Sequence, residues 1–200
     1  SAMSWRGRQL INIRKGGNVT VYKYDRDGNR TQKTKNGTDA RYYTWIGGKL
    51  MREEWTDGSA NKWLEYFYDE SGAPEGGRYN NGTATTKYYY VTNAQGDVME
   101  IRNIYNSLIA TYSYDAWGKV VAIKDANGAE VTSPNVIASI NPIRYRGYYY
   151  DSDTGFYCLQ SRYYDPEFRR FLNADGFVDK SNFNGYNLFT YCYNNPVRYK

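Results

Sequence analysis

Glycines recur at intervals of 20 to 24 residues through more than half of this 200-residue chain, and this period constrains the fold more than any other feature. The sequence around each glycine is similar, and the clearest copies begin with Tyr-Asp. Self-similarity at a period of this size is typical of stacked repeat architectures. One such unit cannot bury its own apolar face, so neighbouring units must cover it. The turn glycines are Gly7, Gly28, Gly48, Gly72, Gly96 and Gly118.

The residues between these glycines favour short antiparallel strands. The runs Val19–Tyr24, Lys87–Val91 and Ala110–Tyr114 are rich in β-branched and aromatic residues, which suit a pleated, half-buried surface. Asn-Gly and Asp-Gly pairs supply positive-φ residues for tight hairpin turns. We therefore expect a mainly β protein, with successive antiparallel hairpins in one spiralling sheet over residues 4–125. The pairs are Asn36-Gly37, Asn81-Gly82, Asn127-Gly128, Asn184-Gly185, Asp27-Gly28, Asp57-Gly58 and Asp175-Gly176.

Three copies of the repeat carry the pair Tyr-Asp, and each residue of the pair has a structural interpretation. The tyrosine supplies an apolar ring with a polar tip, and the aspartate can accept hydrogen bonds from the backbone of its turn. The aromatic faces could instead stack on sugars, so a glycan-binding cell-surface module is an alternative function. Cross-strand packing is the more common role of strand tyrosines. The pairs are Tyr24-Asp25, Tyr68-Asp69 and Tyr114-Asp115.

The composition excludes several kinds of site. The chain has 24 Tyr and no His, which excludes Ser-His-Asp and Cys-His nucleophilic sites and metal sites that need imidazole. We expect no cofactor and no metal. The net charge of +5 is spread along the chain, and acids interrupt the densest basic cluster, Arg162, Arg169 and Arg170. Nucleic-acid binding usually shows a concentrated basic stripe, so no nucleic-acid partner is expected. No apolar run approaches the ~18 residues of a membrane helix.

The cysteines and the first residues carry two smaller predictions. Cys158 and Cys192 are interpreted as two small buried thiols, in preference to a disulfide pair. Residues 1–3 are interpreted as an expression scar, so the chain is expected to be a piece of a longer protein.

A different kind of sequence follows the repeats. Residues 126–140 are rich in Asn, Ser, Pro and small residues and predict a loop. A dense block over residues 141–200 then combines Arg-Tyr-Tyr-Asp-Pro, Asn-Leu-x-x-Tyr and Asn-Asn-Pro, at Arg162–Pro166, Asn187–Tyr191 and Asn194–Pro196. Together with the Tyr-Asp-x-x-Gly repeats, these motifs resemble the Rhs, or YD-repeat, proteins with their repeat-associated core domain.

The resemblance implies both an architecture and a function. Such proteins are long β-sheets wound into a hollow shell that encloses a C-terminal toxin or effector domain of the same chain, and the core region is a plug. The function implied is a structural fragment of shell and plug in a secreted or cell-surface toxin. In many relatives the core region also cuts the chain just downstream by aspartyl chemistry, so an intramolecular autoprotease is a second alternative.

Asp165, Asp175 and Arg162 match the family motifs for that cleavage. Two neighbouring carboxyls cannot both ionise easily, so one can activate water while the other polarises the scissile carbonyl. Arg162 would pair with one carboxylate, keeping it charged and orienting it. Asp151 and Asp153 are weaker candidates. Asp before Pro or Gly is also an ordinary turn residue, so a purely structural role stays open. Relatives often have Asp-Pro where this chain has Asp175-Gly176.

Three expectations concern the fragment itself. The family's cleavage point lies beyond Lys200, so this fragment is expected to be inactive. At most short helical turns are expected, near Glu167–Leu172 and Asn187–Tyr193. Open strand edges invite self-association, unless the core block folds back over the sheet as a compact monomer, and both alternatives stay open. The edges pair with another copy unless charges blunt them, and the charges offered for that role are those of Lys33, Lys35, Lys62 and Lys87.

Overall fold

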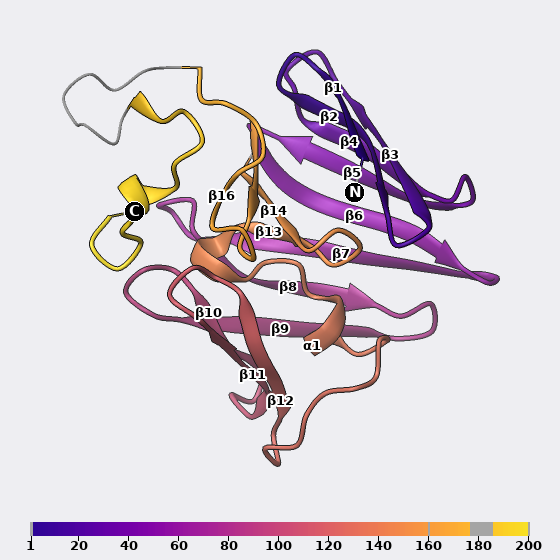
Figure 1. Cartoon of the computed structure of the whole chain (residues 1–200). Coiled ribbons are helices and arrows are strands. Elements are labelled where there is room, and N and C mark those ends of the chain that lie inside the picture. Colours follow the sequence, from indigo (N-terminus) through magenta and orange to yellow (C-terminus); the bar gives the residue numbers. More distant parts are fainter. Residues whose placement is uncertain (1, 160, 177–185, 200) are drawn as a thin grey trace.

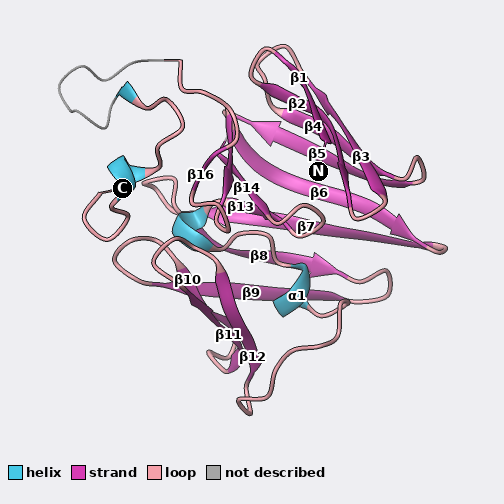
Figure 2. Cartoon of the chain, in the orientation of Figure 1, coloured by secondary structure: helices cyan, strands magenta, loops and turns pink. Residues whose placement is uncertain are grey.

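The computed structural model describes residues 2–159, 161–176 and 186–199. Its main feature is one antiparallel sheet of twelve strands, in which each strand pairs with its neighbours in sequence (Figure 1). Strands and connecting loops make up almost all of the molecule (Figure 2). The predicted fold class, mainly β with successive hairpins, is confirmed. The strands are β1 (Ala2–Arg6), β2 (Gln9–Lys15), β3 (Asn18–Tyr24), β4 (Arg30–Lys35), β5 (Asp39–Ile46), β6 (Lys49–Asp57), β7 (Ala60–Tyr68), β8 (Pro74–Asn80), β9 (Thr85–Thr92), β10 (Val98–Asn103), β11 (Leu108–Tyr114) and β12 (Val120–Asp125).

Alternate hairpins of this sheet repeat one local structure. In the six pairs from β1–β2 to β11–β12, the pairing register shifts close to the turn. Such a bulge adds a residue to one strand and increases the local twist. The six turn glycines predicted from the sequence lie in these hairpins, and all have positive φ, between 60° and 88°. The repeat period is therefore the spacing of bulged hairpins.

Both residues of each Tyr-Asp pair bind main-chain atoms. Each aspartate accepts a hydrogen bond from the backbone N–H four residues later, at 2.8–2.9 Å, as predicted. Each tyrosine hydroxyl donates to a carbonyl at the start of the preceding strand, at 2.7–2.8 Å, and the indole of Trp45 makes the equivalent bond. The acceptors are the carbonyl oxygens of Leu10, Leu50, Val98 and, for Trp45, Arg30.

Residues 141–199 form the core segment, which contains a second antiparallel sheet. Its strands are β13 (Tyr149–Asp151), β14 (Phe156–Leu159), β15 (Arg162–Asp165) and β16 (Arg170–Phe171). Figure 1 shows this small sheet between the first and last strands of the large sheet, which curves around it. Of the two alternatives left open by the sequence, the core block therefore does fold back over the sheet. Self-association through β1 or β12 stays a prediction.

Three apolar clusters join the two sheets. The first packs residues of β2 and β3 against Phe156 and Tyr163. The second fills the centre with side chains of β5 to β11 and Ile143. The third packs Tyr114 and Trp117 against a group of core-segment aromatic residues. Aromatic side chains bury about 150–250 Å² each. They therefore supply much of the buried apolar area in a chain with few aliphatic residues. The third group consists of Tyr145, Tyr157, Tyr164, Phe171 and Tyr191.

The structure corrects several local predictions. The expected loop over 126–140 contains a short helix, α1 (Ile137–Ile140). Near Glu167–Leu172, where at most a short helical turn is expected, no helix forms: the N–H of Leu172 bonds to the carbonyl of Tyr163, and Arg170–Phe171 is a strand. In the range 187–193 a 3-10 helix begins only at its end, over Cys192–Asn194.

The predicted role of the four lysines at strand edges is also wrong. The edge strands of the large sheet are β1 and β12, whereas the lysines lie on β4, β7 and β9, which have neighbours on both sides. Lys33 is buried. A lysine can protect a sheet edge only when it lies on an edge strand. The sequence alone does not show which strands lie at the edges of the sheet.

Replacement of Gly118 by alanine tests the contact between the last repeat and the core segment. Gly118 has φ +84°, and a Cβ there would lie 2.5 Å from the ring of Tyr145. Gly128 has φ +82° with nothing within 4 Å. Gly128→Ala should cost about 1 kcal/mol of unfolding free energy from backbone strain, and Gly118→Ala about 1–3 kcal/mol more because of the clash. Urea denaturation measures both. Equal losses would contradict this packing.

Candidate functional site

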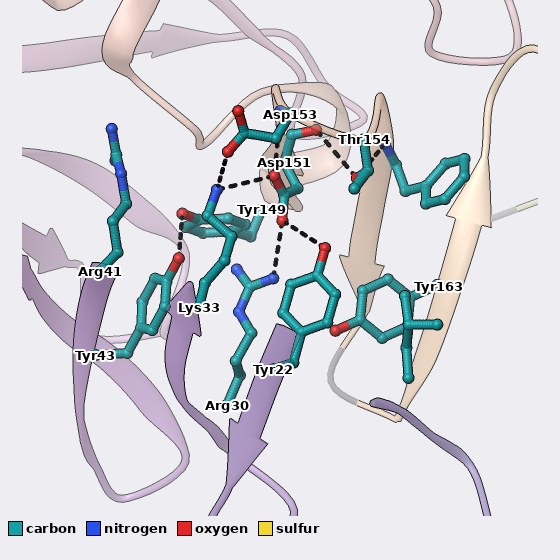
Figure 3. A network of polar contacts seen from close by, with 12 residues as sticks. Tyr22, Arg30, Lys33, Arg41, Tyr43, Tyr149, Asp151, Asp153, Thr154 and Tyr163 are labelled. Carbon is teal, nitrogen blue, oxygen red and sulfur yellow. Dashed lines mark hydrogen bonds and ion pairs between the residues drawn. The ribbon is translucent and has the colours of Figure 1, made fainter. Parts of the chain in front are cut away.

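The core segment is fastened to the large sheet by a buried ionic cluster at the β13–β14 hairpin (Figure 3). The side chain of Asp151 is fully buried, and its two oxygens lie 3.1 Å from Arg30 Nη1 and 3.0 Å from Lys33 Nζ. The hydroxyl of Tyr22 donates to the same carboxylate at 3.3 Å. Burial by itself raises the pKa of Asp151, but Lys33 and Arg30 outweigh that effect and lower the pKa overall. The carboxylate of Asp151 therefore stays ionised, and the two cations balance its charge.

A bulge in β4 brings the two cations to one face. Simple alternation would place Arg30 and Lys33 on opposite faces of the strand. The register between β3 and β4 skips Thr31, since Lys23 pairs with Gln32 and Tyr24 with Arg30. The extra residue turns Arg30 inward beside Lys33, and both are buried.

Asp153 extends the cluster toward solvent. Its carboxylate lies 2.7 Å from Lys33 Nζ and 2.8 Å from Lys35 Nζ. Partial burial raises the pKa of Asp153, and the two lysines reverse that effect, so that the pKa falls to about 2. Asp151 and Asp153, which the sequence offered as weaker catalytic candidates, thus act as docking residues for the β13–β14 hairpin.

A second buried carboxylate fastens the centre of the core segment. Glu53 on β6 is fully buried and pairs with Arg41 Nη1 at 3.1 Å. The hydroxyl of Tyr149 donates to Glu53 at 2.9 Å, and the hydroxyl of Tyr66 donates to its other oxygen. The phenol of Tyr149 thereby connects β13 to an ion pair within the large sheet.

The core segment also binds the turn between β11 and β12, through three tyrosine hydroxyls. Three buried tyrosines donate to successive carbonyls of residues 116–118, at 2.8–2.9 Å. The donors are Tyr145 to Ala116, Tyr164 to Trp117 and Tyr157 to Gly118. The core segment is therefore attached at both ends and at the middle of the curved sheet.

The structure brings two of the three predicted site residues together. Arg162 Nη1 lies 2.6 Å from Asp175 Oδ2, and the guanidinium stacks over the ring of Phe171 at 3.6 Å. Burial lowers the pKa of Arg162, and Asp175 opposes that shift. Asn173 holds this region in place, because its side-chain oxygen accepts the N–H of Tyr163 at 3.0 Å. The ion pair is oriented and partly accessible, which suits a carboxylate that acts on a nearby peptide. Its catalytic role stays a prediction.

The third predicted residue, Asp165, lies at the other end of the same hairpin. It pairs with Arg170 next to the turn, whereas Arg162 begins β15. Three residues of strand span about 10 Å. The carboxylate of Asp165 accepts the N–H groups of Glu167 and Phe168, at 2.8 and 3.2 Å. This is the behaviour of a turn residue before proline, so the geometry favours the structural role that the sequence left open.

Two further predictions concern sulfur and metals. Cys158 and Cys192 are reduced thiols and are not joined in a disulfide, and both are half-buried. Within the part of the chain that the structure describes, no group of three or more Cys, Asp or Glu has the arrangement of a metal site. The absence of a cofactor stays a prediction. None of the described helices is long and apolar enough to cross a membrane.

Much larger proteins contain similar sequences. The chain is 36% identical over 181 residues to the tRNA nuclease WapA of Bacillus subtilis (strain 168). It is 38% identical over 181 residues to the tRNA(Glu)-specific nuclease WapA of Bacillus subtilis subsp. natto. Each match covers 88% of this chain but only 7% of the relative. No protein-family model matches the chain.

Solved structures of toxin complexes share the fold. A TcdB2-TccC3-Cdc42 crystal structure matches with a TM-score of 0.73 at 22% identity, over 98% of this chain and 10% of that one. A Photorhabdus luminescens Tc holotoxin pore matches with a TM-score of 0.73 at 21% identity, over the same shares of both chains. The fold is therefore a curved antiparallel β-sheet of the kind found within these much larger chains. By sequence, this chain is homologous to a part of the WapA nucleases.

Acid titration of Asp153 tests the ionic cluster. Its folded-state pKa is depressed to about 2 from 3.8, so its stabilisation is complete above pH 4 and is lost as the pH falls toward 2. The shift corresponds to about 2 kcal/mol. Urea denaturation between pH 2 and 5 should show this loss in the wild type and not in Asp153→Asn. The exposed Asp39→Asn is the control and should retain it. An unchanged acid slope in Asp153→Asn would contradict the assignment.

Proposed function

We propose that this chain is the end of a shell wall and its closing core in an Rhs or YD-repeat toxin, which encloses a C-terminal toxin domain of the same polypeptide. The observation that carries the proposal is the core segment seated inside the curve of a repeat-built sheet and fastened at three places. Homology to WapA over 88% of the chain supports it. The WapA names describe tRNA nucleases; the activity of the domain that follows this chain is a separate question.

The architecture suits a closing function. An open twelve-stranded sheet with an apolar inner face needs a cover, and the core segment supplies one from the same chain. Buried ion pairs and hydroxyl hydrogen bonds attach the core segment to the sheet. Because these contacts are directional, they specify one position for the core segment. We place the whole protein in a secreted or cell-surface setting, in line with toxins that act on other cells.

The whole protein, with its downstream domain, provides the test. The triple variant Tyr145→Phe, Tyr157→Phe, Tyr164→Phe removes three hydrogen bonds worth about 1 kcal/mol each. Limited proteolysis tracks the open population, so the downstream domain should be digested at least about tenfold faster in this variant. The control is Tyr105→Phe, which changes a tyrosine that is 81% exposed, and it should digest like the wild type. Digestion of the wild-type downstream domain as fast as the isolated domain would contradict enclosure.

A second candidate function is intramolecular cleavage of the chain beyond residue 200. The Arg162–Asp175 pair favours it, because the pair supplies one oriented carboxylate of the kind that acid-base chemistry uses. The geometry gives Asp175 the better claim to an acid-base role, and Asp165 the weaker one.

Cleavage is tested in a chain extended past residue 200. Asp175→Asn should remain in one piece, because it removes the acid-base group. Arg162→Met should be slowed about 100-fold, because the carboxylate loses the guanidinium that orients it and a small misplacement can cost that much. Asp165→Asn keeps an oxygen for the turn and should cleave normally. Gel electrophoresis and mass spectrometry follow the products. Cleavage of Asp175→Asn would refute the assignment, and loss of cleavage in a folded Asp165→Asn would restore the predicted pair.

A further inference from the structure

Arg146 is a buried arginine in a strained conformation. It is 6% exposed and has φ +53°, in the left-handed region that non-glycine residues rarely adopt. Its backbone N–H donates to Asp97 Oδ1 at 2.9 Å. The side-chain amide of Asn93 donates to the other oxygen of Asp97 at 2.6 Å. A repeat turn of the large sheet therefore fixes the direction in which this side chain points. Strain of this kind persists only when the surroundings enforce it.

The guanidinium of Arg146 binds the end of the core segment. Its Nη2 donates to the carbonyl of Tyr199 at 2.9 Å and to the carbonyl of Pro196. Its Nη1 donates to Cys192 Sγ at 3.1 Å. Among the residues that the structure describes, no carboxylate forms an ion pair with it. A buried cation whose oxygen acceptors are main-chain carbonyls recognises the path of the backbone and not a particular side chain.

The same stretch of chain also reaches the Arg162–Asp175 pair. The N–H of Asp175 donates to the carbonyl of Leu188 at 2.8 Å. A few residues later, the ring of Tyr191 lies 4.1 Å from that of Tyr164, centroid to centroid. Residues 188–199 thus run from the candidate carboxylate to Arg146, and both ends are held through their carbonyls.

We propose that Arg146 is a positioning residue that sets where, and in which direction, the chain leaves the core segment toward the downstream domain. The contact to two carbonyls holds residues 196–199 on the core segment. In relation to the cleavage proposed above, this fixes the exit path relative to Asp175. The exit toward a downstream domain and the link to cleavage both rest on the proposed function, whereas the binding of residues 196–199 does not.

Hydrogen exchange on the chain as it stands tests the binding. The N–H groups of Arg198 and Tyr199 both bond to the carbonyl of Asn195, so their exchange reports whether this turn is held. In Arg146→Lys, which keeps a charge but not the planar fork, protection of these two amides should fall about tenfold. Protection in β6 and β7 should be unchanged. The matched control is Arg102→Lys, because Arg102 is partly exposed and forms an ion pair with Glu100. Unchanged protection at residues 198 and 199 would overturn the proposal.

A truncation separates positioning from a general structural role. In a chain that ends at Asn195, the acceptors of Arg146 Nη2 are absent, so Arg146→Lys should cost less unfolding free energy there than in the whole chain. This is a double-mutant cycle, and a coupling near zero would overturn the proposal even if Arg146→Lys destabilises the fold.

The extended chain then tests the link to cleavage. Arg146→Lys should slow cleavage at least about tenfold, with an unchanged pH profile because the reacting groups are intact. If the extended wild-type chain does not cleave, the autoprotease function fails while the exchange result still decides the role of Arg146. Normal cleavage in Arg146→Lys, with residues 198 and 199 unprotected, would overturn the positioning of the exit path.

Discussion

The structure depends on matching a buried carboxylate with cations at the same depth. Asp151 is completely buried where the core segment meets the large sheet, and Arg30 and Lys33 reach it from one strand. A buried charge without a partner costs several kcal/mol. Any other position of the β13–β14 hairpin on the sheet would separate Asp151 from its cations and is therefore strongly disfavoured. The aromatic clusters supply area, which is not directional. The ionic cluster supplies the register of the β13–β14 hairpin on the large sheet.

The repeat half of the chain could be predicted from sequence because its signals are local. A positive-φ glycine, an aspartate that bonds its own turn and an alternating strand are decided within about five residues, and the turn glycines and the aspartate bonds agree with the structure. The ionic cluster was not predictable in the same way. Lys33 and Asp151 are 118 positions apart, and a bulge at Thr31 breaks the alternation that would have located Arg30.

Part of the candidate site was predictable for a similar reason. The motifs singled out Arg162 and Asp175, and the structure pairs them at 2.6 Å. The position of Asp165 depended on the register of the β15–β16 hairpin, which the sequence does not determine. Glu53 offered a signal that was missed: it shares the inward parity of Trp55 on β6, and a glutamate on an inward position needs a cationic partner. Arg146 carried no such signal, because its acceptors are backbone atoms.

One kind of contact recurs from the first repeat to the end of the core segment: a long polar side chain that binds a main-chain carbonyl. The repeat tyrosines bind the preceding strand, three core tyrosines bind the turn at residues 116–118, and Arg146 binds residues 196 and 199. A carbonyl is present whatever the side chain of its residue, so the acceptor positions are free to vary in sequence while the donors are constrained. Conservation would then be expected to concentrate on Tyr, Asp, Arg and Gly. A wall and cover held in this way can keep one geometry while most of its surface residues change, which is the property that a shell built of imperfect repeats requires.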